Sequence, residues 1–169
     1  MKKYSYWDMS AFLGSVITLT SSATPRFWTV VMTGRRPMNS CALGVAACNA
    51  FFSVRYVRLP EMLDDLCVRK DEEWAKSKKK YVKCDLLIID DWMLEPLKEG
   101  EAREVLEIVE ARNTRGSLML CSQFAAGGWA KKLGGDAIAE AIVDRIVHNS
   151  YVIHVEGSES MRKRMSDIS

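Results

Sequence analysis

The sequence predicts an α/β fold in which a five-stranded parallel sheet carries helices on both faces. The first observation is the run at residues 85–89, which is too short for an ordinary helix and is apolar after its first residue, as a strand buried on both faces is. The second is that segments of strand character and of helical character alternate five times along the 169 residues. This alternation is the pattern of a parallel sheet whose crossover helices cover both faces.

Five segments have strand character. They are short and rich in β-branched, aromatic or aliphatic residues, and most are bounded by Gly or polar residues. The predicted strands are residues 27–33, 53–58, 85–89, 117–121 and 151–155.

Four segments have helical character. Residues 41–51 are rich in Ala and Leu, and a second helix begins near Pro60, a residue that suits the first helical position. Residues 101–112 carry an apolar stripe at helical spacing, and Asp136 is placed to cap a helix that runs to about His148.

The stretch at residues 70–83 contains a cluster of lysines, at positions 76, 78, 79, 80 and 83. One interpretation is a solvated helix end or loop. The other is a contact with the phosphate backbone of a nucleic acid.

The composition is that of one globular domain. With 48% hydrophobic and 27% charged residues, the chain is not expected to be disordered, and its net charge of +2 neither favours nor excludes nucleic acid. The five cysteines are odd in number and show no C-x-x-C spacing, and Cys84 and Cys121 fall in or beside predicted core strands. This indicates small buried thiols in a reducing compartment rather than a disulfide framework or a zinc site. No apolar run is long enough to span a membrane and residues 2–23 imitate a secretory signal only loosely, so we expect a cytoplasmic protein without a membrane partner. We assign residues 1–26 to a divergent N-terminal segment and residues 27–169 to the domain.

Two carboxylates, Asp90 and Asp91, directly follow the predicted strand at 85–89. Ligands of parallel sheets bind at the carboxyl ends of the strands. One carboxylate there can hold a hydrated Mg²⁺ beside substrate phosphates while the other orients or deprotonates a water, which is the form of a Walker B motif. The alternative is an acidic turn, because Asp is a good turn and cap residue.

Several long segments carry a resemblance to a known family. They are CALGVAAC (41–48), SVRYVRLPEMLDDL (53–66), DLLIIDDWMLEPL (85–97), EAREVLEIVEAR (101–112), CSQF (121–124), DRIVHNSY (144–151) and GSESMRKR (157–164). From Cys41 onward, the chain resembles the IstB-like transposase-helper ATPases, relatives of the DnaC-like helicase loaders in the AAA+ group. The resemblance implies a three-layer P-loop NTPase-like fold of AAA+/RecA type and a role as an ATP-binding helper of DNA transposition. It also implies ATP and Mg²⁺ as cofactors, and DNA, a transposase and further copies of the chain as partners.

The resemblance implies roles for residues at the strand ends. Asp90 resembles the Mg²⁺-binding Walker B acid, and Asp91 resembles the acid that positions the attacking water. Ser122 matches the polar sensor that faces the γ-phosphate, and its alternative is a turn residue at the end of a strand.

Two arginines resemble further parts of such a site. Arg145 resembles an arginine finger that reaches the nucleotide of a neighbouring subunit, because a planar guanidinium suits a pair of phosphate oxygens. The alternative for Arg145 is an ordinary ion pair with Asp144 or Glu140. Arg162 resembles the second sensor arginine, and its alternative is a solvated basic tail.

The phosphate-binding loop departs from the family pattern. The signature G-x-x-x-x-G-K-[ST] supplies backbone N–H groups around the phosphates, a Lys for the β- and γ-phosphates and a hydroxyl for Mg²⁺. Counting from Gly34, the chain has Asn39 for the second Gly, Ser40 for the Lys and Cys41 for the hydroxyl. The loop resembles one shortened by about one helical turn.

Neighbouring arginines replace the missing Lys only in part. Counting back from Cys41 puts Arg36 in the place of the Lys, but Pro37 then takes the place of the hydroxyl and removes a backbone donor. The candidate nucleotide contacts are Gly34, Arg35, Arg36 and Ser40. We expect ATP binding to be much weaker than in a relative with the complete loop.

Three functions are open at this point. The first is an ATP-dependent transposition helper that assembles side by side and contacts DNA through basic surfaces. The second is a binding module of the same fold without ATP turnover, which engages DNA or a transposase. The third is an unrelated α/β protein in which Asp90 and Asp91 form a turn. The poor match before residue 27 suggests either a truncated or rearranged gene copy or a natural adaptor; we favour the first function for the family and the second for this chain.

Overall fold

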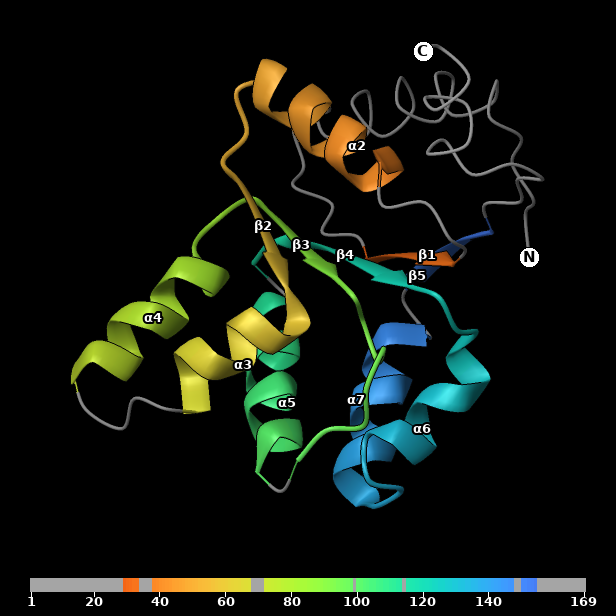
Figure 1. Cartoon of the computed structure of the whole chain (residues 1–169). Helices are drawn as coiled ribbons and strands as arrows, with labels where there is room; N and C mark the ends of the chain where they lie inside the picture. Colours follow the sequence, from red (N-terminus) through yellow and green to blue (C-terminus); the bar gives the residue numbers. More distant parts are fainter. Residues whose placement is uncertain are drawn as a thin grey trace, which may run out of the picture.

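The strands form one parallel sheet. The structure, a computed structural model, describes residues 29–33, 38–67, 72–98, 100–113, 115–147 and 150–154. The strands are β1 (Thr29–Thr33), β2 (Val54–Arg58), β3 (Leu86–Asp90), β4 (Ser117–Ser122) and β5 (Ser150–His154). They lie in the order β2-β3-β4-β1-β5, and every neighbouring pair is parallel (Figure 1). The predicted five-stranded parallel sheet is therefore confirmed.

Helices cover both faces of this sheet, as predicted. Helix α2 (Met38–Asn49) crosses one face, and the other described helices lie on the opposite side (Figure 1). These are α3 (Leu59–Cys67), α4 (Glu72–Val82), α5 (Glu101–Arg112), the short 3-10 helix η1 (Ala126–Gly128), α6 (Trp129–Lys132) and α7 (Ala137–Val147). None of the described helices is long and apolar enough to cross a membrane.

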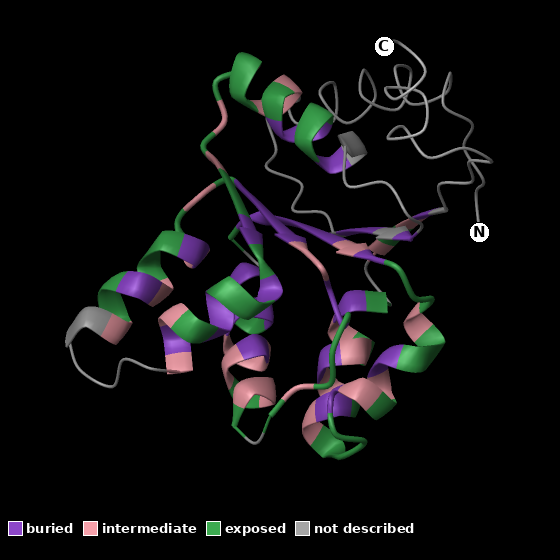
Figure 2. Cartoon of the chain, in the orientation of Figure 1, coloured by how far each residue is buried: buried purple, intermediate pink, exposed green. Residues whose placement is uncertain are grey.

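Strand β3 takes part in two apolar cores. Leu86 and Ile88 pack with Leu43 of α2, whereas Leu87 and Ile89 belong to the larger core on the other face. The four β3 side chains are at most 4% exposed, and Figure 2 shows the centre of the sheet as buried. Because both faces are covered, the strand is a continuous apolar run rather than an alternating one.

The lysine-rich stretch forms a helix, α4. Ser77 and Tyr81 are buried and Trp74 is half-buried, and these three residues recur at helical spacing on the inner side. Lys78 forms an ion pair with Glu107 of α5. Most of the stretch therefore forms a helix that packs on α5. Because lysines are so frequent in it, the residues that face inward are hard to recognise from the sequence.

The sequence does not predict η1 and α6. They have three and four residues, and Gly127 and Gly128 favour a loop. Trp129 anchors this segment, because it is fully buried and meets Trp92 edge-on with ring centroids 5.8 Å apart. Helix α7 begins as predicted, since the side chain of Asp136 accepts a hydrogen bond from the N–H of Ala139, 2.8 Å away.

Arg112 is buried and forms no ion pair with a carboxylate among the described residues. Its guanidinium donates hydrogen bonds to the carbonyl oxygens of Tyr81 (2.6 Å), Cys84 (3.0 Å), Asp85 (3.2 Å) and Ser117 (2.6 Å). A Cβ at Gly116 would lie 2.5 Å from Nη2 of Arg112, so the glycine leaves room for the guanidinium. Arg112 thus joins the chain that enters β3 to the chain that enters β4.

We expect Arg112→Met to lower the free energy of unfolding by about 3 kcal/mol or more, because several buried carbonyl oxygens lose a charged donor together. Urea denaturation measures this change. Arg115→Met is the matched control: its side chain is exposed, and the expected change is within about 0.5 kcal/mol. Equal losses in the two variants would show that the carbonyl contacts do not stabilise the fold.

Candidate functional site

The carboxyl ends of the strands meet at one edge of the sheet. From β1 the chain crosses through α2 to β2, whereas from β4 it crosses through α6 and α7 to β5, on the other side of β1. Strands β1 and β4 are neighbours, and the crossovers that follow them run in opposite directions. The last residues of these two strands, Thr33 and Ser122, are register partners. Such a switch point is where open α/β sheets bind ligands.

Asp90 ends β3 on the face that is covered by α2. It follows Ile88 by two residues, and alternate side chains of a strand point to the same face. Its Oδ2 accepts a hydrogen bond from the hydroxyl of Tyr56, and its Oδ1 accepts one from the N–H of Asp91, 2.8 Å away. Tyr56 lies opposite Ile88 in the register, so its long side chain reaches Asp90 diagonally across the strands.

The first turn of α2 lies at the same corner. Helix α2 begins at Met38, before the start predicted at residue 41, so that Ser40 and Cys41 belong to its first turn. Ser40 is buried and forms a hydrogen bond with the thiol of Cys121 on β4. Burial is the main reason that the pKa of Cys121 rises to about 12; the Ser40 hydrogen bond lowers it, and the charge of Asp90 raises it. The start of α2 and Asp90 therefore act on the same thiol.

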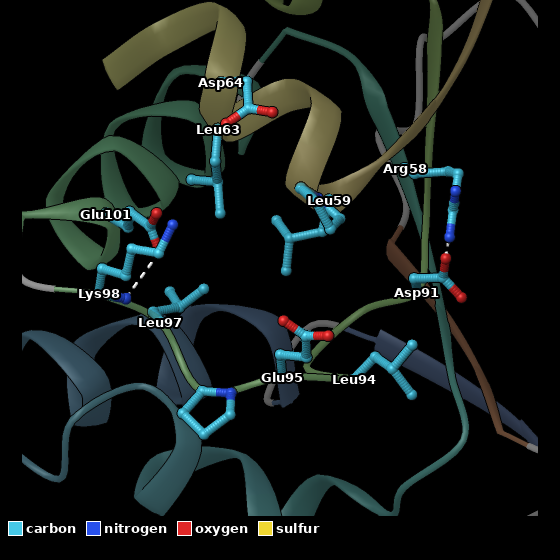
Figure 3. A pocket seen from close by; sticks show the side chains of 12 residues that line it. Arg58, Leu59, Leu63, Asp64, Asp91, Leu94, Glu95, Leu97, Lys98 and Glu101 are labelled. Carbon is cyan, nitrogen blue, oxygen red and sulfur yellow. Dashed lines mark hydrogen bonds and ion pairs between the residues drawn. The ribbon is translucent and has the colours of Figure 1, made fainter. Parts of the chain in front are cut away.

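Asp91 turns to the other face. Its backbone is left-handed, with φ of 54°, as is that of Met93, so the chain changes direction directly after β3. Its Oδ2 accepts a hydrogen bond from Nε of Arg58 at the end of β2, 2.7 Å away (Figure 3). This hydrogen bond, followed by the charge of Asp91, raises the pKa of Arg58. The two adjacent acids thus have separate partners.

Ser122 is buried at the end of β4. Its hydroxyl donates a hydrogen bond to the carbonyl oxygen of Trp92 (2.9 Å) and accepts bonds from the N–H of Phe124 (3.1 Å) and from Nε1 of Trp129 (3.3 Å). It follows Leu118 and Leu120 by even steps, so it lies on the face opposite to Asp90. In this arrangement Ser122 holds the loops after β3 and β4 together, and its sensor role stays a prediction.

Arg145 pairs with a residue of the neighbouring helix α5. One of its nitrogens lies 2.7 Å from Oε1 of Glu110, and another donates to the carbonyl oxygen of Ala141, 3.1 Å away. The role of Arg145 as an arginine finger stays a prediction. The other predicted site residues, Gly34, Arg35, Arg36 and Arg162, lie outside the described residues.

The donor set at Asp90 fits a magnesium ion that is shared with phosphates. Each oxygen of Asp90 accepts one hydrogen bond and keeps a lone pair for a hard cation. Within the described ranges, no group of three or more His, Cys, Asp or Glu side chains could hold a metal by itself. Mg²⁺ is commonly bound by one or two carboxylates together with water and phosphate oxygens, so a single acid at this place is compatible with it.

No pattern in the sequence singles out Tyr56 and Arg58, which bind the two acids. Both residues lie in a predicted strand, and their types are common on exposed strand faces. The contacts depend on β2 lying next to β3, which no local pattern reveals. Tyr56 and Arg58 could therefore have been predicted only from the order of the strands in the sheet.

The family model of IstB-like ATP-binding proteins matches residues 32–169. The chain belongs to this family. Two proteins of Sinorhizobium fredii, y4pL and y4uH, whose names describe insertion-sequence ATP-binding proteins, are 40% and 39% identical to it over 125 residues. The alignments cover 73% of this chain and 51% and 50% of the relatives, so the chain spans about half their length. A similarly named protein of insertion sequence IS21 from Pseudomonas aeruginosa is 28% identical over 122 residues, covering 72% of this chain and 46% of the relative.

Solved structures share the fold of this IstB-like chain. The DnaI crystal structure has a TM-score of 0.74 at 14% identity, covering 90% of this chain and 82% of that one. AMPPCP-bound DnaA from Aquifex aeolicus has a TM-score of 0.67 at 16% identity, covering 98% of this chain and 51% of that one. At these identities the likeness shows the fold alone, and it confirms the predicted P-loop NTPase-like α/β fold of AAA+ type.

We expect Asp90→Ala to make one tyrosine easier to ionise. Burial, then the hydrogen bond and the charge of Asp90, hold the pKa of Tyr56 above its ordinary value of 10.0. Because the neutral phenol is the bonded form, this contact stabilises the fold below pH 10 and is lost as the pH rises through the folded-state pKa. Without the carboxylate, tyrosinate absorbance in an alkaline ultraviolet titration should appear at lower pH.

Asp64→Ala is the control for this titration, because Asp64 is exposed and contacts no tyrosine among the described residues. Its curve should match that of the wild type. Superimposable curves for wild type and Asp90→Ala would contradict the contact between Tyr56 and Asp90.

Proposed function

We propose that this chain is the ATP-binding part of an insertion-sequence helper protein that acts on DNA together with a transposase. The observation that carries the proposal is that Asp90, at the end of β3, and Ser40, in the first turn of α2, both act on the thiol of Cys121, next to the switch point between β4 and β1. The names of its relatives, which describe insertion-sequence ATP-binding proteins, support it. We propose residues 27–169 as the working domain.

The two acids have different parts in this proposal. Asp90 is the ligand of Mg²⁺, which would neutralise charge on the phosphates when bound. Asp91 orients the attacking water. Because its carboxylate lies on the α3 side with Arg58, Asp91 must separate from that guanidinium before it can do so.

The remaining roles follow the family pattern. Ser122 and Arg162 are the proposed sensors. Arg145 is the proposed finger in a homo-oligomer, and it would exchange its ion pair with Glu110 for the phosphates of a neighbouring copy.

Weak ATP binding is the second part of the proposal. Ser40 occupies the position of the Lys when the signature is counted from Gly34. Its side chain is buried and carries no charge that could bind a phosphate. One lost charge-assisted contact costs about 1.5–3 kcal/mol. That corresponds to roughly 10- to 150-fold in affinity.

We expect the triple variant Asn39→Gly/Ser40→Lys/Cys41→Thr to bind ATP at least about tenfold more tightly than the wild type in the presence of Mg²⁺. The variant completes the signature from Gly34, which provides the ammonium and the hydroxyl that the chain lacks. Isothermal titration calorimetry with and without Mg²⁺ measures the gain.

The matched control is Asn39→Gly/Ser40→Met/Cys41→Thr, which has a long side chain at position 40 without the charge. Its affinity should stay near that of the wild type, and adding Asp90→Ala to the lysine variant should remove the effect of Mg²⁺. Micromolar, Mg²⁺-dependent binding by the wild type would contradict the proposed weakness. Equal affinities of the lysine and methionine variants would contradict its explanation.

A second candidate function is a binding module of the same fold that does not hydrolyse ATP. It is favoured by the protein partners of Asp91, Arg145 and Ser40, because these contacts complete the described part of the fold without a nucleotide. Gel retardation of DNA with and without ATP separates the two functions, since only the first requires the nucleotide.

The exposed side of α4 supports the DNA part of the proposal. Three exposed lysines of α4 and one directly after it recur at spacing i, i+3, i+4 and i+7: Lys76, Lys79, Lys80 and Lys83. None of them has an ion-pair partner in the described part of the chain, whereas Lys78, on the inner side, pairs with Glu107. Unpaired cations along one helix side suit the phosphates of a nucleic-acid backbone.

We expect Lys76→Ala/Lys79→Ala/Lys80→Ala to weaken DNA binding and to lower the slope of log affinity against log salt by up to about 3, because each phosphate contact contributes about 0.9. Fluorescence anisotropy with a short duplex at several salt concentrations measures both effects. The control Lys98→Ala/Arg115→Ala/Lys131→Ala removes three exposed cations from scattered positions. An equal change of slope in the two triple variants would show that α4 is not a particular contact surface.

A further inference from the structure

A pocket of about 130 Å³ lies on the α3 side of the sheet, next to Asp91 (Figure 3). Its walls are the end of β2, the first turns of α3 and the loop from β3 to α5. Leu59 and Leu63 of α3 face Leu97 of the loop across the space. An engineered cavity of about 150 Å³ binds benzene, so this pocket has room for about one side chain. It is much smaller than the roughly 300–1,000 Å³ of most small-molecule sites.

The rim of the pocket is acidic. Its charged residues are the acids Asp64, Asp91, Glu95 and Glu101 and the cations Arg58 and Lys98, a net charge of −2 in a chain of +2. Two of the acids are engaged: Asp91 binds Arg58 at 2.7 Å, and Glu101 accepts a hydrogen bond from the backbone N–H of Lys98 at 2.6 Å. These contacts fix the two ends of the pocket.

The other two acids are available. Asp64 and Glu95 are exposed, and neither side chain has a hydrogen-bond or ion-pair partner among the described residues. Figure 3 shows Glu95 extending from the loop toward the space below Leu59. An apolar floor therefore lies between carboxylates that can accept a cation.

We infer that this pocket is a docking site for a segment of a partner protein that presents one apolar side chain beside a lysine or an arginine. The apolar side chain fills the space between Leu63 and Leu97, and the neighbouring cation meets Asp64 or Glu95. Phosphate groups would be repelled by the excess of carboxylates, so the rim chemistry favours a protein segment over a nucleic acid. This inference does not depend on nucleotide binding.

The test uses the full chain without nucleotide and three capped pentapeptides as probes, observed through the amide signals of the protein by nuclear magnetic resonance. Gly-Lys-Leu-Lys-Gly should shift the amides of Leu59, Leu63 and Leu97 in a saturable manner. Gly-Glu-Leu-Glu-Gly, with reversed charge, and Gly-Lys-Ser-Lys-Gly, without the apolar group, should each bind at least about threefold more weakly.

Three variants assign the charge effect to the rim. Asp64→Lys and Glu95→Lys should each weaken binding of Gly-Lys-Leu-Lys-Gly by about threefold or more. Glu140→Lys should leave it unchanged, because Glu140 is exposed on α7 outside the pocket. The inference is overturned by shifts centred elsewhere, by equal binding of the three peptides, or by an equal loss in Glu140→Lys. A single-stranded oligonucleotide that shifts the same amides would overturn it in favour of nucleic acid.

Discussion

The burial of β3 on both faces is the constraint on which the fold and the candidate site depend. Its four apolar residues reach into two separate cores, so a charge is tolerated only where the strand leaves its cover. Asp90 is the first residue at that boundary and, by the alternation of the strand, it keeps to the α2 side. Asp91 is the first residue beyond it, and it lines the pocket on the α3 side. Adjacent residues therefore serve opposite faces of one sheet.

The turn after Asp90 is held by packing and by hydrogen bonds. Left-handed backbone at a residue other than glycine costs about 1–2 kcal/mol, and the turn contains two such residues, Asp91 and Met93. Trp92 lies between them and is fully buried, and burial of a tryptophan contributes about 3–5 kcal/mol by comparison with alanine. The backbone N–H of Trp92 donates a hydrogen bond to the carbonyl oxygen of Cys121 (2.9 Å). The backbone carbonyl oxygen of Trp92 accepts a hydrogen bond from the hydroxyl of Ser122 (2.9 Å). The end of β4 thus fixes the geometry of both acids.

The helices and strands that were predicted well are those whose signal lies within one short stretch of sequence. The run at 85–89 and the stripe at 101–112 gave β3 and α5 nearly to the residue, because double burial and helical amphipathicity leave direct traces in the sequence. Helix α4 is obscured, since lysines outnumber the inward residues Trp74, Ser77 and Tyr81. Helix α6 has one anchor, Trp129, and no period to detect.

The contacts at the site could be predicted only in part, because they arise from strand order. The two aspartates are recognisable from their position after an apolar strand. Tyr56 and Arg58 become their partners only because the chain passes over two strands before it forms β2 beside β3. The same dependence explains why Arg145 pairs with Glu110 on another helix: α5 and α7 are packed side by side, although β4 and α6 separate them in the sequence.

The charges of the molecule separate the proposed tasks of DNA binding and ATP binding. Of the described residues at the corner of Asp90, Ser40, Cys41, Cys121 and Tyr56 carry no positive charge, and the guanidinium of Arg58 is bound to Asp91. Exposed lysines lie instead along α4, which is held at the β2 edge of the sheet by its contacts with α3 and α5 (Figure 1). Since α4 is held by packing and by polar contacts with α3 and α5, a change in the phosphate-binding loop is expected to leave the basic side of α4 in place. The proposed weakening of the nucleotide site would therefore leave the proposed DNA-binding surface intact, which is the physical basis for the second candidate function.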